Sequence, residues 1–380
     1  MLITNIKVTD LYGLHNYDIT FDKEECLKII HAPNGYGKTT ILKLIRAILE
    51  GYIDELQQIP FRRFMIVCDH AISVEVYKEN DELFYHFTNG QFEESYQVNT
   101  DKNADLSASI LSRLKSITKE MPIYLINADR LWLEKKEYTD ATHMFLPTVL
   151  EYAKELSELM REALAQSNYC GQELDRSFPN RLIKYLNDEE AAYLSIEEIK
   201  EQLQALEKKR TILESAGLFS NVPVTLPEEL SQVDEKILKV LTLYIEDSHE
   251  KLRAFESLAT KINLLATLIN KRFSYKVMEV NMKNGFVFEV PTKEKLKADK
   301  LSSGEQNELI LLFKLLFKSP ANALILIDEP EISLHIAWQQ SFLEDMEAIA
   351  ALTQVKLIIA THSPDIINGR WDLTTGLEEC

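Results

Sequence analysis

The chain of 380 residues has little cysteine, with four residues at positions 26, 68, 170 and 380. No two of them form a CxxC pair, and their spacing matches no set of metal ligands. The scarcity argues against a disulfide-stapled secreted domain and against a cysteine-ligated metal centre. We therefore expect reduced thiols in a cytoplasmic protein.

Long apolar runs are absent as well. No segment reaches the about 18 apolar residues of a membrane span, and no charged-then-apolar signal opens the chain. Apolar residues nevertheless make up 46% of the total, which is enough for a large core. We expect a soluble intracellular protein without a membrane partner, built either as one large domain with an insertion or as two domains.

Positive charge is in deficit. The chain has 42 Lys and Arg against 60 Asp and Glu, so its formal net charge is −18. Such an acidic protein does not attract polyphosphate backbones unless it has a local basic patch or a basic partner. DNA is therefore a disfavoured partner, and only a local patch would leave it open.

Glycine nearly vanishes between residues 146 and 272, where Leu, Glu and Lys dominate. Within residues 252–269 the apolar positions recur every three or four residues, which predicts helices with one apolar stripe. Pro223 and Pro227 interrupt the pattern, so we expect two antiparallel helical arms with a turn near 216–230. These arms form either a helical subdomain packed on the core or a lever that docks a partner.

Outside this stretch, alternating or continuous apolar segments predict strands, and the fold class is therefore α/β. A helix is expected near 106–117. The Asn284-Gly285 pair predicts a hairpin that returns the chain to the sheet. The expected strands are residues 1–10, 15–21, 27–30, 64–68, 72–77, 83–87, 122–127, 275–282, 285–290, 323–328 and 355–361.

A glycine-rich loop lies between the strand at 27–30 and an apolar helix at 41–49. Backbone N–H groups around its glycines and the positive end of the helix suit a phosphate chain, and Ala32 stands where the loop motif has its first glycine. Lys38 would reach the β- and γ-phosphates, and Thr39 would place its hydroxyl on Mg²⁺. The expected ATP-binding residues are Asn34, Gly35, Tyr36, Gly37, Lys38, Thr39 and Thr40.

Two acids, Asp328 and Glu329, stand at the end of the buried strand at 323–328. Asp328 is placed to hold Mg²⁺, and Glu329 to orient the attacking water, because phosphoryl transfer depends on positioning and charge stabilisation. His362 follows the next buried strand and would face the γ-phosphate from the opposite side of the cleft. Glu329 and His362 are thus the expected catalytic residues, and Thr39 and Asp328 the expected metal ligands.

Three further positions have two interpretations each. Ser303-Gly304 at a helix start is either a second anion site or a simple helix cap. At the end of the strand at 122–127, Arg130 or Asn127 could sense the γ-phosphate, and the alternative for Arg130 is a surface ion pair. His15 lies in a turn and is either near the nucleotide or an ordinary surface histidine.

Four segments resemble the motifs of ABC-type ATPases. They are residues 34–40 (NGYGKTT) for Walker A, 301–305 (LSSGE) for the signature motif, 324–330 (LILIDEP) for Walker B and 361–363 (THS) for the switch histidine. The set is similar to the SMC, RecF and OLD branch of the AAA family ATPases. The departures are Ala32, Ser303 in place of the central glycine of the signature, and a Q-loop glutamine that is not identifiable.

The resemblance implies a P-loop ABC-ATPase head with a mixed sheet, helices on both faces, an antiparallel β subdomain and an inserted helical subdomain. Residues 1–145 and 273–380 would form the head and residues 146–272 the insertion. It also implies ATP hydrolysis with Mg²⁺ and a homo-oligomer, at least a dimer, in which two heads sandwich two ATP molecules. The residues implied to act on the partner's nucleotide are Ser302, Ser303, Gly304 and Glu305.

OLD-type nucleases continue into a nuclease domain, whereas 18 residues follow His362 here, so we expect any nuclease to be a separate protein. The chain resembles ATPase subunits of bacterial antiphage systems, such as Septu, retron-associated and PARIS ATPases. That likeness implies an ATPase that holds or activates an effector, such as a nuclease. The alternative is a RecF- or SMC-like repair ATPase that clamps DNA.

Overall fold

The computed structural model describes residues 3–21, 25–69, 72–80, 82–90, 92–98, 104–126, 132–135, 144–218 and 234–377. The chain forms two compact units: unit 1 contains residues 1–131 and 303–380, and unit 2 contains residues 132–302. Among the described helices, none is both long enough and apolar enough to cross a membrane.

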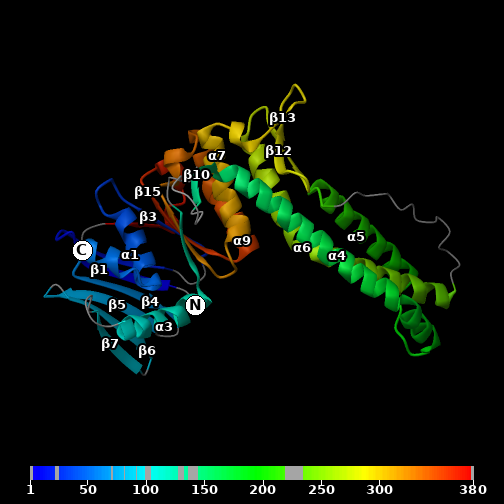
Figure 1. Ribbon diagram of the computed structural model, residues 1–380, viewed down its shortest axis with the longest axis horizontal. Helices are drawn as coiled ribbons and strands as arrows, with labels where there is room; N and C mark the ends of the chain where they lie inside the picture. The colour runs from blue at the N-terminus through cyan, green and yellow to red at the C-terminus, as the bar shows by residue number, and fades with distance from the viewer. Residues whose placement is uncertain are drawn as a thin grey trace. The chain divides into compact units, whose positions relative to one another are not determined.

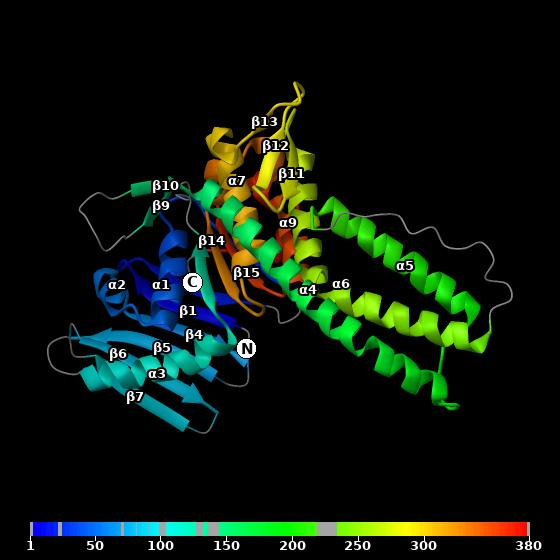
Figure 2. The ribbon, with the colours of Figure 1, turned by 45° about the vertical axis from the view of Figure 1, so that its right-hand side comes forward.

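Unit 1 contains a six-stranded antiparallel sheet with the order β2-β1-β4-β5-β6-β7 (Figure 2). Its strands alternate between buried and exposed residues, as in β6, where Leu83, Tyr85 and Phe87 are buried. Asn80 and Gly90 adopt left-handed conformations in the tight turns. The strands are β1 (Ile3–Leu11), β2 (His15–Thr20), β4 (Arg63–Cys68), β5 (Ile72–Glu79), β6 (Glu82–Asn89) and β7 (Phe92–Val98).

A second sheet of unit 1 has five parallel strands in the order β16-β3-β15-β14-β8. Its register pairs Thr361 with His31 and Asp328 with Ala360, so three central strands end at one edge. The chain leaves that edge into the segments that carry the predicted site residues. The strands are β3 (Leu27–His31), β8 (Ile123–Ile126), β14 (Leu324–Asp328), β15 (Lys356–Thr361) and β16 (Thr374–Gly376).

Helix α1 (Lys38–Glu50) lies between the two sheets of unit 1. Its apolar residues from Ile41 to Leu49 share one core with Phe64 of β4 and with Leu326 of β14. Gly51, at φ 75°, ends the helix in the left-handed conformation that glycine adopts without strain. This packing fixes the first turn of α1 at the edge where β3 ends.

The other elements of unit 1 cover its sheets and connect their strands. The helix predicted near 106–117 is α3 (Ala104–Glu120), and the strand predicted at 122–127 is β8 at the edge of the parallel sheet. The remaining elements are α2 (Ile53–Gln58), α7 (Ser303–Phe313), the π-helical η4 (Lys314–Lys318), η5 (Pro330–Ser333), α8 (Ile336–Gln339), α9 (Phe342–Thr353), α10 (Pro364–Ile367) and η6 (Trp371–Leu373).

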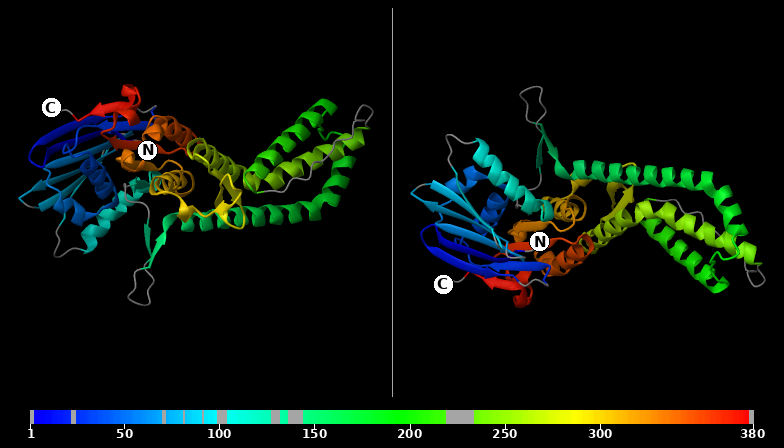
Figure 3. Two further views of the ribbon diagram at one scale, coloured as in Figure 1. Left: turned by 90° about the horizontal axis from the view of Figure 1, so that it is seen from above. Right: turned by 90° about the horizontal axis from the view of Figure 1, so that it is seen from below.

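Unit 2 is dominated by three helices: α4 (Thr148–Asn187), α5 (Ile196–Ser215) and α6 (Glu235–Arg272). Helices α4 and α6 lie side by side along much of their length (Figures 1 and 3). The guanidinium of Arg181 on α4 donates two hydrogen bonds of 2.7 Å to the carboxylate of Asp247 on α6. The two helices have 40 and 38 residues, and α5 is a third helix where two helical arms were expected.

The expected antiparallel arrangement of the arms around residues 216–230 is wrong, because α5 and α6 run parallel. His249 contacts Gln202 at 3.1 Å, and Glu256 accepts a 2.7 Å bond from Lys209, so the contacts advance in the same direction on both helices. The antiparallel neighbour of α6 is α4.

The hairpin formed by β11 (Val277–Asn281) and β12 (Gly285–Glu289) does not return to a sheet of unit 1, contrary to expectation. It pairs with β13 (Lys295–Leu296) in a separate sheet and packs on α4 and α6, so residues 273–302 belong to unit 2 rather than to the head. The remaining elements of this unit are β9 (Trp132–Lys135), β10 (Met144–Pro147) and η3 (Ala298–Lys300).

Two glycines explain how closely the hairpin is held. Gly285 has φ +68°, and a Cβ built there would lie 1.8 Å from the carbonyl oxygen of Ala153 on α4. Gly217, just after α5, has φ +69°, and its Cβ would lie 2.1 Å from the carbonyl oxygen of Val280. Only glycine permits both the backbone conformation and the contact at these positions.

Candidate nucleotide-binding site

The glycine-rich loop connects β3 to α1 at the carboxyl edge of the parallel sheet. Gly35 and Gly37 have φ +94° and +82°, and Gly35 faces open space. Gly37 is the N-cap of α1 and provides no side-chain hydrogen bond to the first turn. The N–H groups at the start of α1 are therefore available to an anion, as this loop type requires.

Lys38 is buried, and its ammonium lies against the backbone at the start of the loop. Its Nζ donates to the carbonyl oxygens of Ala32 at 2.8 Å and Pro33 at 3.1 Å. An ammonium has three protons, so one donor remains for a ligand. The backbone carbonyls thus hold the positive charge where the phosphates of a nucleotide would lie.

Aromatic residues support the loop from the side of β2. The hydroxyl of Tyr17 donates to the carbonyl of Tyr36 at 3.0 Å, and the ring of His15 stacks on both tyrosine rings at 5.6 Å. His15 therefore lies against the loop, and its proximity to a nucleotide stays a prediction. Asn34 is exposed, and the hydroxyl of Thr40 lies 3.1 Å from that of Tyr12.

Thr39 and Asp328 meet across the site. The Thr39 hydroxyl donates to Asp328 Oδ1 at 3.0 Å. Burial raises the pKa of Asp328 above its ordinary value, and the charge of Glu329 adds to the rise, whereas the Thr39 hydroxyl opposes it. A hydroxyl and a half-buried carboxylate destabilised by a neighbouring acid fit Mg²⁺, because the cation would offset the repulsion.

Glu329 has an unusual backbone conformation for a residue with a Cβ, with φ 43° and ψ 62°. Its N–H donates to the carbonyl oxygen of Ala360 at 2.9 Å, which ties the end of β14 to β15. A left-handed non-glycine residue costs about 1–3 kcal/mol and persists only where its surroundings impose it. The strain is located at the residue that was predicted from the sequence to orient the attacking water.

His362 follows β15 and lies beside two glutamates. Its Nδ1 is 2.9 Å from Glu331 Oε1 and 3.9 Å from Glu329 Oε1, and its ring is partly exposed. The structure therefore brings together Thr39, Asp328, Glu329 and His362 at one edge of the sheet. Arg130 and Asn127 lie outside the described residues.

The signature residues lie at the start of α7. Ser302 and Ser303 are exposed, Gly304 is half-buried, and Glu305 is buried. Ser303 is the first residue of the helix. Exposed hydroxyls at a helix start are compatible with both interpretations of this segment, an anion site and a cap.

Sequence reasoning gave Glu331 no part in the site beyond a place in the segment 331–335 that stands where ABC-type ATPases have the D-loop. Glu331 accepts hydrogen bonds from Thr361 Oγ1 at 2.7 Å and from the N–H of His362 at 2.9 Å. Sequence reasoning also missed Gln339, whose Oε1 accepts from the hydroxyl of Ser363 at 2.8 Å. The available signal was weak: a third acid in the run Asp-Glu-Pro-Glu, and polar residues on both sides of His362.

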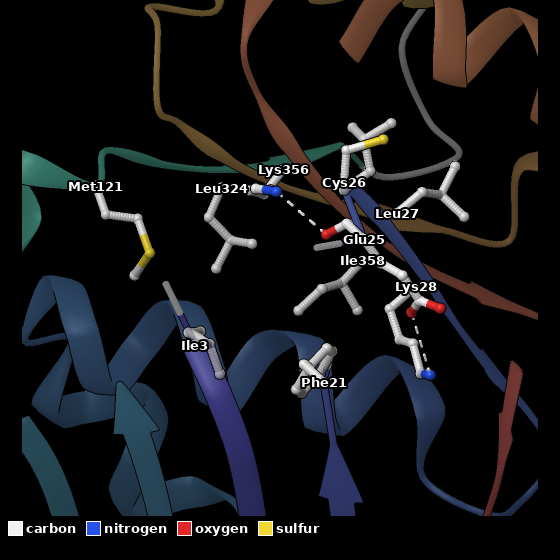
Figure 4. Close-up of a pocket in the computed structure, with 11 residues that line it drawn as sticks. Ile3, Phe21, Glu25, Cys26, Leu27, Lys28, Met121, Leu324, Lys356 and Ile358 are labelled. Atoms are coloured by element: carbon white, nitrogen blue, oxygen red, sulfur yellow. Dashed lines mark hydrogen bonds and ion pairs between the residues drawn. The ribbon is translucent and has the colours of Figure 1, made fainter. Parts of the chain in front are cut away.

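A small pocket elsewhere in unit 1 is not a candidate for the nucleotide (Figure 4). It lies at the amino ends of the parallel strands, beside Leu27, Leu324 and Leu357, and therefore at the edge opposite the loop. Its volume of about 40 Å³ is room for one water molecule. Nearby, Lys356 donates to the carbonyl oxygen of Glu25 at 3.2 Å.

The chain belongs to the AAA ATPase domain family, whose model matches residues 1–367. It is therefore an ATPase. No curated protein matches the chain.

Two solved structures are similar over nearly the whole chain. One is the Smc head domain of Pyrococcus furiosus with an extended coiled coil, bound to the C-terminal domain of ScpA; it is 15% identical at a TM-score of 0.40, over 96% of this chain and 91% of that one. The other is an SmcHead bound to the C-winged helix domain of ScpA; it is 13% identical at a TM-score of 0.40, over 97% of this chain and 91% of that one.

Proposed function

We propose that this ATPase is a switch that dimerises around two ATP molecules and thereby holds or activates a separate effector protein. The observation that carries the proposal is the convergence of three strand ends at one edge of a parallel sheet. That edge brings Lys38, the Thr39–Asp328 pair, Glu329 and His362 together.

Each group has a distinct task in hydrolysis. The loop N–H groups and Lys38 bind the phosphates, and Thr39 and Asp328 would hold Mg²⁺, which when bound offsets phosphate charge. Glu329 orients the attacking water with its carboxylate, and His362 donates to or positions the γ-phosphate. These are tasks of positioning and charge stabilisation, which account for most of the catalysis in phosphoryl transfer.

Dimerisation is proposed from the signature segment. Ser302 and Ser303 are exposed residues at the start of α7, and a hydroxyl beside a helix N-terminus suits the γ-phosphate of a nucleotide held by a second copy. Gly304 is half-buried and would lie beside that surface, whereas Glu305 is buried and would act from behind it. Closure of the two heads would then depend on ATP, and hydrolysis through Glu329 would reopen them.

The effector is proposed to be a separate protein, such as a nuclease, in a cytoplasmic antiphage system. The formal net charge of −18 suits a basic partner, since an acidic surface attracts it and repels free nucleic acid. The three-helix unit offers a surface on which such a partner could dock.

The test is co-expression of the chain with the protein encoded next to it, followed by size-exclusion chromatography with light scattering. A stable complex whose composition changes between wild type and Glu329→Gln in ATP supports effector control. Two proteins that elute separately, with and without ATP, would contradict it.

A second candidate function, clamping of duplex DNA, is favoured by a basic groove within unit 2. Residues 271–300 contain eight Lys and Arg against four Asp and Glu, although the whole chain is acidic. Lys295 pairs with Glu279 and Glu289, so part of this charge is neutralised. The basic residues that line the groove are Lys154, Arg161, Lys283, Lys295 and Lys297.

The two functions are separated by a binding measurement with a labelled duplex DNA at physiological salt. If the groove clamps DNA, Lys283→Glu combined with Lys297→Glu weakens binding by about tenfold or more and reduces its salt dependence. The matched control is Lys208→Glu on α5, an exposed lysine away from the groove. No DNA binding by the wild type, with or without ATP, would eliminate this candidate.

A further inference from the structure

The carboxylate of Glu331 is buried between the ends of two strands of the parallel sheet. Only 6% of its side chain is exposed, and its Oε1 accepts from the Thr361 hydroxyl at 2.7 Å and from the His362 N–H at 2.9 Å. The same oxygen lies 2.9 Å from His362 Nδ1. One oxygen atom thus holds both the backbone and the ring of the switch histidine.

This contact determines which ring nitrogen faces the phosphate. Nδ1 lies 2.9 Å from an oxygen of Glu331, so Nε2 is the ring nitrogen left for the reacting phosphate. Glu329 does not compete for the ring, because its Oε1 is 3.9 Å from Nδ1, beyond hydrogen-bond distance. Of the two glutamates, one orients the histidine and the other remains available for water.

The turn that carries His362 is fixed on its other side as well. The Ser363 hydroxyl donates to Gln339 Oε1 at 2.8 Å, and the Ser363 N–H donates to Thr361 Oγ1 at 3.0 Å. In the described part of the chain, Oε2 of Glu331 is buried without a hydrogen-bond partner. A buried unpaired carboxylate oxygen is costly, so stability alone does not explain a glutamate at this position.

We propose that Glu331 is a positioning residue for ATP hydrolysis, which holds the backbone and the ring of His362 so that Nδ1 faces its carboxylate and Nε2 is directed to the γ-phosphate. The inference rests on the role proposed above for His362. It assigns separate tasks to the two glutamates that flank Pro330.

A double-mutant cycle tests the proposal, with kcat, KM for ATP and ATP affinity measured for Glu331→Ala, His362→Ala and the double variant. We expect Glu331→Ala to lower kcat by about 10–100-fold with little change in ATP affinity, as for other residues that orient a reacting group. The double variant should be no slower than His362→Ala alone. Glu331→Gln, which keeps an acceptor oxygen, should recover most of the loss.

The outcomes separate this inference from the proposed function. If His362→Ala lowers kcat and Glu331→Ala does not, or if the two losses multiply, the positioning role is wrong and the role of His362 stands. If His362→Ala leaves kcat unchanged, the proposed role of His362 fails first.

A spectroscopic measurement covers the case in which Glu331→Ala does not fold. NMR of the full chain with isotope-labelled histidine identifies the protonated ring nitrogen, and His362→Ala assigns the signal. We expect the ring signals of His362 to shift in Glu331→Ala or, if that variant does not fold, in Glu331→Gln, because the group that faces Nδ1 changes. Ring signals of His362 that stay unchanged would overturn the inference.

Discussion

Thr39 and Asp328 are 289 positions apart in the sequence, yet the Thr39 hydroxyl donates a 3.0 Å hydrogen bond to Asp328 Oδ1. The contact joins the first turn of α1 to the end of β14, and therefore joins the two segments of the chain that form unit 1. Unit 2 is inserted between them in sequence. The proposed metal site therefore forms only when the two segments of unit 1 have assembled correctly.

Replacing Asp328 should increase the stability of the ligand-free protein and abolish its turnover. Because burial and Glu329 raise the folded-state pKa of Asp328 above its unfolded value, the ionised carboxylate destabilises the ligand-free fold at neutral pH. This destabilisation decreases as the pH falls through the raised pKa, because the carboxyl in the folded protein then becomes protonated. Asp328→Asn should therefore raise Tm at pH about 7.5 by about 1–2 °C, and abolish Mg²⁺-dependent turnover.

The same comparison repeated at about pH 4, close to the ordinary aspartate pKa, should give a smaller Tm difference, because a carboxyl with a raised pKa is protonated to a greater extent there than at neutral pH. Glu201→Gln, an exposed acid on α5, serves as the control and should leave Tm unchanged at both pH values. A lower Tm for Asp328→Asn at neutral pH would contradict the account of this site.

Lys38→Ala should abolish ATP binding. The ammonium lies over the loop with one donor unused, and each charge-assisted hydrogen bond to a phosphate contributes about 1.5–3 kcal/mol. We expect a loss of affinity of about 100-fold or more, measured with a fluorescent ATP analogue. Lys208→Ala is the matched control, and equal affinity in the two variants would remove Lys38 from the site.

Gly285→Ala should destabilise unit 2. The new methyl group would lie 1.8 Å from the Ala153 carbonyl oxygen, and the left-handed backbone would be strained as well. We expect a loss of several kcal/mol, seen as a lower denaturant midpoint.

The control is Gly171→Ala on α4, where the added Cβ meets only Lys251 at 3.7 Å. It should be neutral or stabilise the helix by about 0.5–1 kcal/mol. If both variants unfold at the same midpoint, the hairpin is not held by the contact between Gly285 and α4.

The sequence predicted elements whose signal is local. The alternation of Leu83, Tyr85 and Phe87 and the continuous apolar run that ends at Asp328 both became strands, and the glycine-rich loop lies where the motif places it. These patterns reflect burial on one or two faces and need no knowledge of partners.

Features that depend on contacts between distant segments were not predictable. The apolar stripe of α6 predicts a helix but does not specify in which direction the neighbouring helix runs. The parallel arrangement of α5 and α6 was therefore not predicted. The hairpin was placed in the wrong unit because nothing in its own residues specifies Ala153 as the neighbour of Gly285. The contact of Glu331 was missed because its partner His362 lies 31 positions further along the chain.

Glu329→Gln should keep ATP affinity and lower kcat by about 100-fold or more, because the amide cannot accept the proton of water. Phosphate release in a steady-state assay measures the change, with Lys38→Ala as the variant that fails to bind. Turnover as fast as the wild type would show that another group activates the water.

The most direct test of the account is the mass of Glu329→Gln in solution, measured by size-exclusion chromatography with light scattering, with and without ATP and Mg²⁺. We predict twice the 43.8 kDa mass of one chain in ATP and a single chain without it, with the dimer lost when Lys38→Ala or Ser303→Arg is added. A mass of 43.8 kDa in saturating ATP would contradict ATP-driven dimerisation.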